Sequence, residues 1–361
     1  MGREVSELTG ASIASPDFRL KENNFDLLRF LFAFIVFLVH AYSLSGAEQL
    51  SILSEVFSSE IAVKSFFVVS GFLIFMSYEN SRSARHYFIN RFKRIYPAYF
   101  FIIVGCAAMA GSVTTYSWQA YFSSMQTLKY IAANLLFLNF LQPNLPGLFE
   151  HNTLQAVNGA LWTLKIEVLF YLLVPLAVMG FRKFGRLPLL IILYCGSVIY
   201  SFGTEYLANK SGAGFYLELQ RQLPGQLAFF IAGAAAYYYL PYLTKYGKYL
   251  LGIALMAFVV PSWLPWIAIQ PMALGIIVIY VACVLPNLGN FDKYGDFSYG
   301  IYIVHFPILQ LIIAQGGFNQ HPWQSLAMTG LLVLAAAFLL WHFIEKPFLR
   351  KSSHYVLANR G

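Results

Sequence analysis

The stretch FDLLRFLFAFIVFLVH, residues 25–40, is almost wholly apolar, yet it has an arginine near one end and a histidine at the other. A run of this length and hydrophobicity predicts a transmembrane helix. Arg29 and His40 are eleven residues apart, close to three helical turns, so both project from one face about 16 Å apart along the axis. A charge near the bilayer centre costs about 2.5–3.5 kcal/mol, which favours a functional role. The alternative is a snorkelling arginine and a hydrogen-bonded core histidine.

The composition of the whole chain agrees with a membrane protein. The chain has 361 residues, of which 58% are hydrophobic and only 11% are charged, whereas soluble proteins carry about 25% charged residues. The three cysteines, Cys106, Cys195 and Cys283, all lie in apolar runs. We therefore interpret them as small core residues, and we expect neither disulfides nor a metal site.

Apolar windows of helix length predict ten transmembrane helices. We expect an all-α integral membrane protein with a cytoplasmic segment at 1–24, a transmembrane domain at 25–345 and a cytoplasmic tail at 346–361. The ten windows are 25–46, 60–79, 92–112, 160–181, 187–204, 223–241, 246–261, 266–286, 297–315 and 324–345.

The positions of the basic residues support this count and predict the orientation. If the N-terminus is cytoplasmic, most of the 24 lysines and arginines fall on cytoplasmic segments, as the positive-inside rule requires. Both termini are then cytoplasmic. Within the longest outer segment, about 113–159, the apolar stretch 128–141 is short for a span, so we expect it to lie in the interface or to re-enter. The exceptions to the cytoplasmic placement are Lys129, Lys210 and Arg221 in outer segments and Arg29, Lys64 and Lys165 in spans.

The stretch NGALWTLKIEVLFY, residues 158–171, contains a glutamate inside the predicted fourth span. Glu167 is expected at a depth similar to that of His40. A buried carboxylate there is suited to orient the imidazole and to stabilise its cationic form. The alternative is a structural ion pair of Glu167 with Lys165 or Arg221.

A basic cluster lies between the second and third spans, in RHYFINRFKRIYP, residues 85–97. Arg91, Lys93 and Arg94 suit the binding of the phosphates of a cytosolic ligand. The alternative is that they contact anionic lipid headgroups. Glu345, in FIEKPF at the end of the tenth span, is an expected structural partner for this cluster.

Two further stretches place small or polar residues within spans. Ser70 and Gly71 in FFVVSGFLIF either allow close helix packing or leave room for a thin ligand. Tyr302 and His305 in YGDFSYGIYIVHFP lie on one side of the ninth span. A satisfied core histidine is the alternative for His305.

These stretches together resemble the membrane-bound acyltransferase-3 family. The matching motifs are Arg29-x10-His40, FFVVSGFLI, RFKRIYP, NGALWTLKIEVLFY, SYGIYIVHFP and IEKPF, which occur in the order of the family between about residues 23 and 348. The resemblance implies a ten-helix protein of the bacterial inner membrane. Such proteins move an acyl group, commonly acetyl, from cytosolic acyl-CoA to sugar hydroxyls of exopolysaccharide, lipopolysaccharide, peptidoglycan or secreted small molecules. Many members carry an additional hydrolase-like domain, and this chain resembles the stand-alone type.

The resemblance also assigns roles to residues. It implies that Arg29 and His40 are an essential pair, that the inner-face arginines bind the phosphates of acetyl-CoA, and that Glu167 occupies the acidic position of the fourth helix. The expected site residues are His40, Glu167 and Arg29 for catalysis, Arg91, Arg94, Lys93, Ser70 and Gly71 for the donor, and Tyr302, His305 and Trp162 for the acceptor.

Two mechanisms and three functions remain open. Neutral His40 either takes the proton of the attacking hydroxyl or accepts the acyl group first. The expected partners are acyl-CoA, a glycan or lipid-linked sugar acceptor and membrane lipids, without nucleic acid. A polytopic transporter of glycans or glycolipids is the main alternative function, and an assembly subunit that tolerates loss of His40 is the other.

Overall fold

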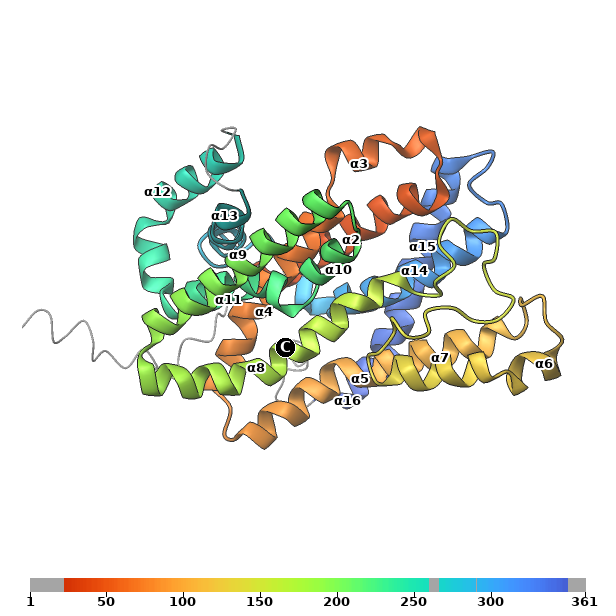
Figure 1. Cartoon of the computed structure of the whole chain (residues 1–361), viewed down its shortest axis with the longest axis horizontal. Coiled ribbons are helices and arrows are strands. Elements are labelled where there is room, and N and C mark those ends of the chain that lie inside the picture. Colours follow the sequence, from red (N-terminus) through yellow and green to blue (C-terminus); the bar gives the residue numbers. More distant parts are fainter. Residues whose placement is uncertain (1–22, 260–265, 290, 350–361) are drawn as a thin grey trace, which may run out of the picture.

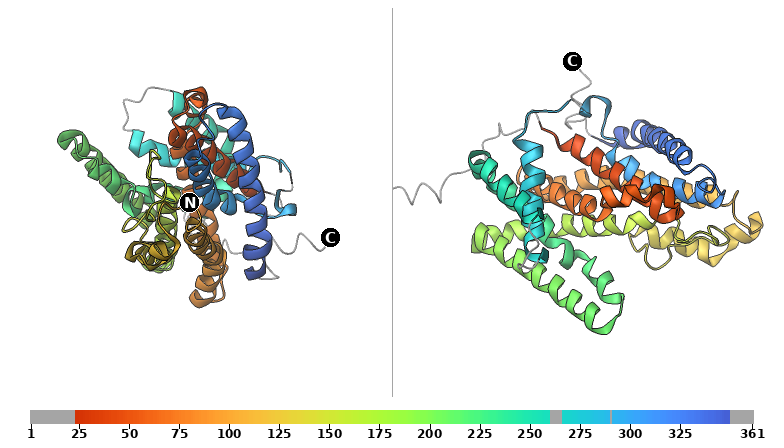
Figure 2. Two further views of the ribbon diagram at one scale, coloured as in Figure 1. Left: turned by 90° about the vertical axis from the view of Figure 1, so that its right-hand side faces the viewer. Right: turned by 90° about the horizontal axis from the view of Figure 1, so that it is seen from above.

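A computed structural model describes residues 23–259, 266–289 and 291–349, and within these ranges all regular secondary structure is helical. The long helices form a bundle in which many run roughly side by side (Figure 1). The end of α9 and the short helix α10 project from the rest of the bundle, as both views of Figure 2 show. Most of the predicted cytoplasmic segment 1–24, the end of the tail 346–361 and the end of the window 246–261 lie outside the described residues.

Each of the ten apolar windows falls on a long helix, which confirms the helical prediction. These helices are α2 (Phe25–Ser45), α4 (Ser59–Glu79), α5 (Ala84–Ala110), α8 (Trp162–Phe184), α9 (Arg186–Ser211), α11 (Leu223–Tyr238), α12 (Leu240–Val259), α13 (Trp266–Cys283), α14 (Ser298–Ala314) and α15 (Pro322–Leu340). Shorter elements are α3 (Ile52–Val56), α6 (Trp118–Ser123), α7 (Met125–Leu135), α10 (Phe215–Gln220), α16 (Lys346–Phe348) and a π-helical turn at Trp341–Glu345.

Among the described residues, seven helices are long and apolar enough to cross a membrane. Helices α11 and α12 follow one another with a bend of 110°, and α14 has only 17 residues. The chain is therefore a multi-pass membrane protein, while the count of ten spans and the cytoplasmic termini stay predictions.

Helices α4 and α11 approach each other closely at two glycines. A side chain at Gly71 would collide with the backbone carbonyl of Phe230, and one at Gly233 would collide with the carbonyl of Val68. Such backbone-to-backbone contact is typical of small residues in membrane helices. The alternative that Gly71 leaves room for a thin ligand is wrong, because α11 fills this space. Ser70, one residue earlier, is partly exposed.

Prolines inside α14 and α8 each leave one backbone carbonyl without its helical donor, and a side chain from another segment bonds to it. Pro307 has no N–H for the carbonyl of Ile303, and the side-chain amide of Asn158 donates to this carbonyl instead, at 2.8 Å. In α8, Pro175 likewise offers no N–H to the carbonyl of Tyr171, and the hydroxyl of Tyr87 donates to this carbonyl instead, at 3.2 Å. These bonds fasten the start of the NGALW stretch to α14, and α5 to α8.

The apolar stretch 128–141 forms most of α7 and the turn that follows it. α7 packs beside α5 (Figure 1), and the hydroxyl of Tyr99 donates to the carbonyl of Asn134 at 2.6 Å. The ring of Phe137 stacks on that of Tyr99 with centroids 4.3 Å apart. Tyr99 lies eleven residues before the end of α5, about 16 Å along its axis. These contacts place α7 along α5, and the two expected placements of the stretch, interfacial and re-entrant, stay predictions.

Candidate active site

Helices α2 and α14 lie side by side and run in the same direction (Figure 1). Arg29, near the start of α2, contacts Asp296 just before α14, and His40, three turns further along α2, contacts His305 within α14. The ten-span prediction requires this parallel arrangement, because the first and ninth spans must both begin on the same side. The two helices therefore carry one polar contact at each of two levels.

At the first level, two arginines and two acids form what we call the ionic cluster: Arg29, Arg94, Asp296 and Glu345. One carboxylate oxygen of Asp296 accepts from both guanidinium groups, and Arg94 also donates to Glu345 at 3.2 Å. Only 1% of each acid side chain is exposed. The cluster ties together α2, α5, the start of α14 and the π-helical turn after α15.

The charge on Asp296 is stabilised by its surroundings. Burial by itself would raise the pKa of this carboxyl, but the guanidinium groups of Arg29 and Arg94 and the bonds from Ser298 outweigh burial and lower the pKa to about 2. Ser298 contributes through its hydroxyl and through its backbone N–H, which lies 3.1 Å from the second carboxylate oxygen. Asp296 is therefore ionised near neutral pH.

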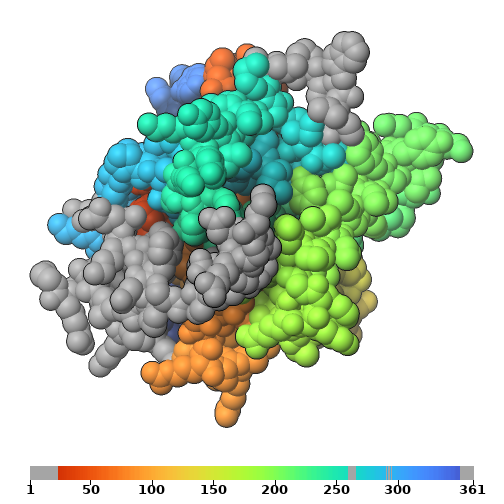
Figure 3. All heavy atoms as spheres, turned by 90° about the vertical axis from the view of Figure 1, so that its left-hand side faces the viewer, coloured from red at the N-terminus to blue at the C-terminus, as the bar shows by residue number. Residues whose placement is uncertain are grey.

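The prediction that Glu345 is a structural partner of the basic cluster is confirmed for Arg94. Arg91, one helical turn earlier, has its guanidinium carbon 5.9 Å from the ring centre of Tyr171, and its buried Nε makes no hydrogen bond. Lys93 is partly exposed. Figure 3 shows the left-hand side of Figure 1, where the start of α5 (orange), the end of α8 (yellow-green) and α12 (teal) lie.

Glu167 lies between the two levels, away from His40. Its carboxylate accepts a hydrogen bond of 2.6 Å from the hydroxyl of Tyr171, one turn along α8. Thr163, one turn before Glu167, instead has its hydroxyl 2.8 Å from that of Tyr302. From the contact between Thr163 and Tyr302, α8 and α14 run in opposite directions. Glu167 lies four residues further along α8 and His305 three residues further along α14, so the two are separated by about 10 Å along the helix axes. The predicted contact between Glu167 and His40 is therefore wrong.

The structural alternative for Glu167 is also not found. Lys165 donates to the side-chain oxygen of Gln222 at 2.6 Å, and Arg221 pairs with Glu218 at 2.8 Å. The sequence places Glu167 correctly within a span. Its depth was misjudged because the predicted helix boundary does not determine how far α8 is displaced along its axis relative to α2.

At the second level, the two histidines contact each other directly. Nδ1 of His40 lies 2.9 Å from Nε2 of His305, and the rings are stacked with centroids 5.2 Å apart. The ring of Phe306 packs edge-on against His40 at 5.6 Å. His305 is fully buried, whereas His40 is partly exposed. His40 is thus the more exposed residue of the pair.

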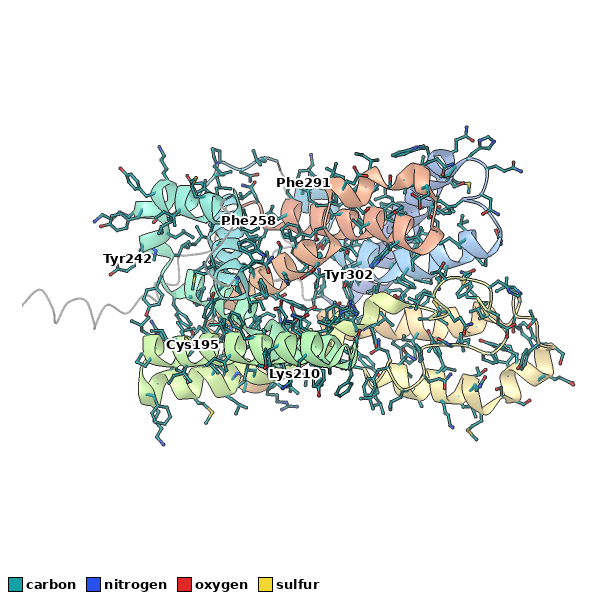
Figure 4. All side chains as sticks on the ribbon, turned by 45° about the horizontal axis from the view of Figure 1, so that its top comes forward. Cys195, Lys210, Tyr242, Phe258, Phe291 and Tyr302 are labelled. Carbon is teal, nitrogen blue, oxygen red and sulfur yellow. The ribbon has the colours of Figure 1, made fainter. Side chains whose placement is uncertain are left out.

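Two of the three acceptor residues expected from the sequence lie next to each other. Tyr302 and His305 lie on one side of α14 with ring centroids 5.9 Å apart, as predicted. Figure 4 labels Tyr302 in the interior of the bundle, whereas Tyr242 lies at its periphery. Trp162 is the first residue of α8 and packs against the core. Within the described residues, no group of three His, Cys, Asp or Glu side chains is placed to hold a metal ion.

Comparison with known proteins identifies the family. A family model described as an acyltransferase domain, that of acyltransferase family 3, matches residues 22–342. The chain belongs to the acyltransferase-3 family. The acyltransferase is 27% identical over 339 residues to an O-acetyl transferase of Shigella phage Sf6. The aligned region covers 92% of this chain and 98% of the relative. It is 26% identical over 365 residues to nodulation protein 10 of Rhizobium leguminosarum bv. viciae, with 91% and 93% covered. No solved structure matches this acyltransferase.

Two contacts of the site were not expected from the sequence. Asp296 was not singled out, although it is the acid directly before the ninth helix in the quoted stretch YGDFSYG. Thr163 was also missed, and an isolated threonine near a helix start gives no signal of its own. For Asp296 the signal was available, because an acid at the end of an apolar helix needs a partner and both Arg29 and Arg94 were already expected at that level.

Proposed function

We propose that this acyltransferase moves an acetyl group from cytosolic acetyl-CoA to a hydroxyl of a cell-surface or exported glycan, free or lipid-linked, at the outer side of the bacterial inner membrane. One arrangement supports this reaction above all others. Arg29 and His40 lie on one face of α2, about 16 Å apart. Asp296, just before α14, is the partner of Arg29, and His305 within α14 is the partner of His40. Basic groups at one level and a partly exposed histidine at the other suit a donor that enters from one side and an acceptor from the other.

The donor end of this path is basic. Coenzyme A carries phosphates, for which arginine is a favourable partner because of its planar, bidentate donor geometry. Arg91 and Lys93 are the candidates for these contacts, since Arg94 is bonded to Asp296 and Glu345. The buried Nε of Arg91 makes no hydrogen bond within the described residues, and an anionic group of the donor would supply the acceptor that it lacks. In this proposal Arg29 and Arg94 shape the donor site through the ionic cluster. The acetyl group is suggested by the name of the phage relative, an O-acetyl transferase.

The acceptor hydroxyl is a weak nucleophile and needs a base. Its oxygen attacks the thioester carbonyl carbon, a C–O bond forms and the C–S bond breaks. His40 takes the hydroxyl proton in this step, and the proton then passes to the thiolate, which leaves as free coenzyme A. We centre the chemistry on His40 because it is the partly exposed residue of the histidine pair. The glycan acceptor and the inner membrane rest on the family resemblance.

Inverted membrane vesicles, with the cytoplasmic face outward, test the proposal. Radiolabelled acetyl-CoA is added outside, and label is counted in the polysaccharide fraction. We expect incorporation by the wild type and none by His40→Ala at matched protein levels. His151→Ala is the control, because this histidine is exposed in the loop before α8. Equal incorporation by wild type and His40→Ala would overturn the role of His40. An inactive wild type would overturn the assigned donor or acceptor and would favour a transporter.

A further inference from the structure

We infer that His305 is a positioning residue that holds His40 in the tautomer whose Nε2 carries a lone pair. This inference rests on the proposed role of His40 as the base. In the structure, the function expected of Glu167, to orient the imidazole of His40, is performed by a second imidazole. The device is therefore a neutral histidine in place of the carboxylate that orients the base in a serine hydrolase triad.

The hydrogen bonds of His305 determine its own tautomer. Its Nδ1 lies 3.2 Å from the carbonyl oxygen of Ile301, one turn earlier in α14. A carbonyl oxygen accepts only, so Nδ1 of His305 must carry the hydrogen in this bond. A neutral imidazole has one N–H, and Nε2 of His305 is consequently an acceptor.

The tautomer of His40 follows from this acceptor. Nδ1 of His40 lies 2.9 Å from Nε2 of His305. Since Nε2 of His305 has no hydrogen, Nδ1 of His40 must donate. The other ring nitrogen of His40, Nε2, then carries a lone pair and is able to take a proton. Two hydrogen bonds in series, the first to the backbone carbonyl of Ile301 and the second between the two rings, thus set the basic nitrogen of the site.

Several contacts hold His305 in this position. It is fully buried, and its ring packs against Tyr302 and Phe306, with centroids 5.9 and 6.2 Å away. Burial favours the neutral imidazole because a charged group away from water is costly without a counter-charge. No carboxylate of the described residues is hydrogen-bonded or ion-paired to either ring. The neutral form that the tautomer argument requires is therefore the one that the surroundings favour.

The same geometry assists the transfer step. When Nε2 of His40 takes the proton of the acceptor, the ring becomes an imidazolium with a hydrogen on both nitrogens. Its Nδ1–H then donates a charge-assisted hydrogen bond to His305, which is stronger than the bond between neutral rings. The stabilisation is greater after proton transfer than before it, so it lowers the barrier and not merely the energy of the bound substrate.

Two substitutions separate this role from packing. In His305→Phe a ring remains but the acceptor is lost, whereas in His305→Gln the side-chain oxygen is able to accept from Nδ1 of His40. For His305→Phe we expect a loss in kcat of about 100-fold or more, the usual contribution of a positioned base, with an unchanged KM for acetyl-CoA. His305→Gln should recover a large part of this loss. A wild-type kcat in His305→Phe, or an equal loss in both variants at equal thermal stability, overturns the inference.

The tautomer is also measured directly, without the reaction. Nitrogen-15 spectra of histidine-labelled protein distinguish N–H from lone-pair nitrogens, and the resonances of His40 are those missing in His40→Ala. We expect hydrogen on Nδ1 of His40 in the wild type. Hydrogen on Nε2 of His40 in the wild type overturns the inference. This measurement needs only the wild type and His40→Ala, so it decides the question even if His305→Phe fails to fold. Since the spectra need no substrate, they give this result even if the wild type transfers no acetyl group and the proposed function fails.

Discussion

Substitution of Asp296 by asparagine tests whether the ionic cluster holds the bundle together. Asparagine has nearly the same shape, and its side-chain oxygen still accepts from the backbone N–H of Ser298. The change therefore keeps this bond, removes the negative charge, and replaces the oxygen that accepts from both arginines by an NH2 group, which only donates. Arg29 and Arg94 both donate to one oxygen of Asp296, and Asp296→Asn would remove this shared negative partner of the two guanidinium groups.

The expected loss follows from the burial of the acid. Only 1% of the side chain of Asp296 is exposed, and 17% and 11% of those of Arg29 and Arg94. Removal of one partner from a buried ion pair costs about 3–5 kcal/mol, because it leaves an uncompensated charge away from water. We expect Asp296→Asn to lower the free energy of unfolding by an amount in this range, measured by reversible unfolding in mixed micelles.

Asp26→Asn is the matched control. It makes the same chemical change on the other carboxylate near Arg29, but this acid is 20% exposed and 3.8 Å from the guanidinium group. A pair with solvent access contributes about 0–1 kcal/mol. If Asp296→Asn costs no more than Asp26→Asn, the ionic cluster does not stabilise the fold and our reasoning is refuted.

Three further outcomes are expected. Because the fold lowers the pKa of Asp296 to about 2, its contribution to stability is complete above the unfolded pKa of about 4 and is lost as the pH falls toward 2; an unchanged acid limb in Asp296→Asn would contradict this. Gly71→Ala should destabilise by about 1–3 kcal/mol, since the methyl group would meet the backbone of α11. Gly105→Ala should not destabilise the protein, because there is open space around Gly105. Equal melting temperatures for the Gly71→Ala and Gly105→Ala variants would disprove the close packing of α4 and α11. Asn158→Ala should lower the free energy of unfolding by about 1–3 kcal/mol, because it leaves the carbonyl of Ile303 unsatisfied. An unchanged melting temperature would contradict this role of Asn158.

The sequence was sufficient for properties that depend on one helix at a time. Hydrophobic runs located all ten long helices, because a helix in lipid must satisfy its backbone internally and present apolar side chains along its length. The common face of Arg29 and His40 followed from helical geometry alone. The same is true of Tyr302 and His305, which share one side of α14.

The structure was needed for the partner of each polar residue. Asp296 bonds to two arginines that lie 267 and 202 residues away, and His40 contacts His305 across 265 residues, whereas Glu167 turns to Tyr171 within its own helix. Gly71 could be assigned to packing only once α11 was seen against it.

The physical reason for this division is the range of the interactions. Hydropathy and helical periodicity are local, so the sequence by itself determined that the chain is a helical membrane protein with a cation and an imidazole on one face of its first helix. The rotation of each helix and its displacement along its axis depend on side chains packed against neighbouring helices. A shift of one turn, about 5.4 Å, changes which side chains meet, so only the tertiary structure decided that His305 and not Glu167 contacts His40.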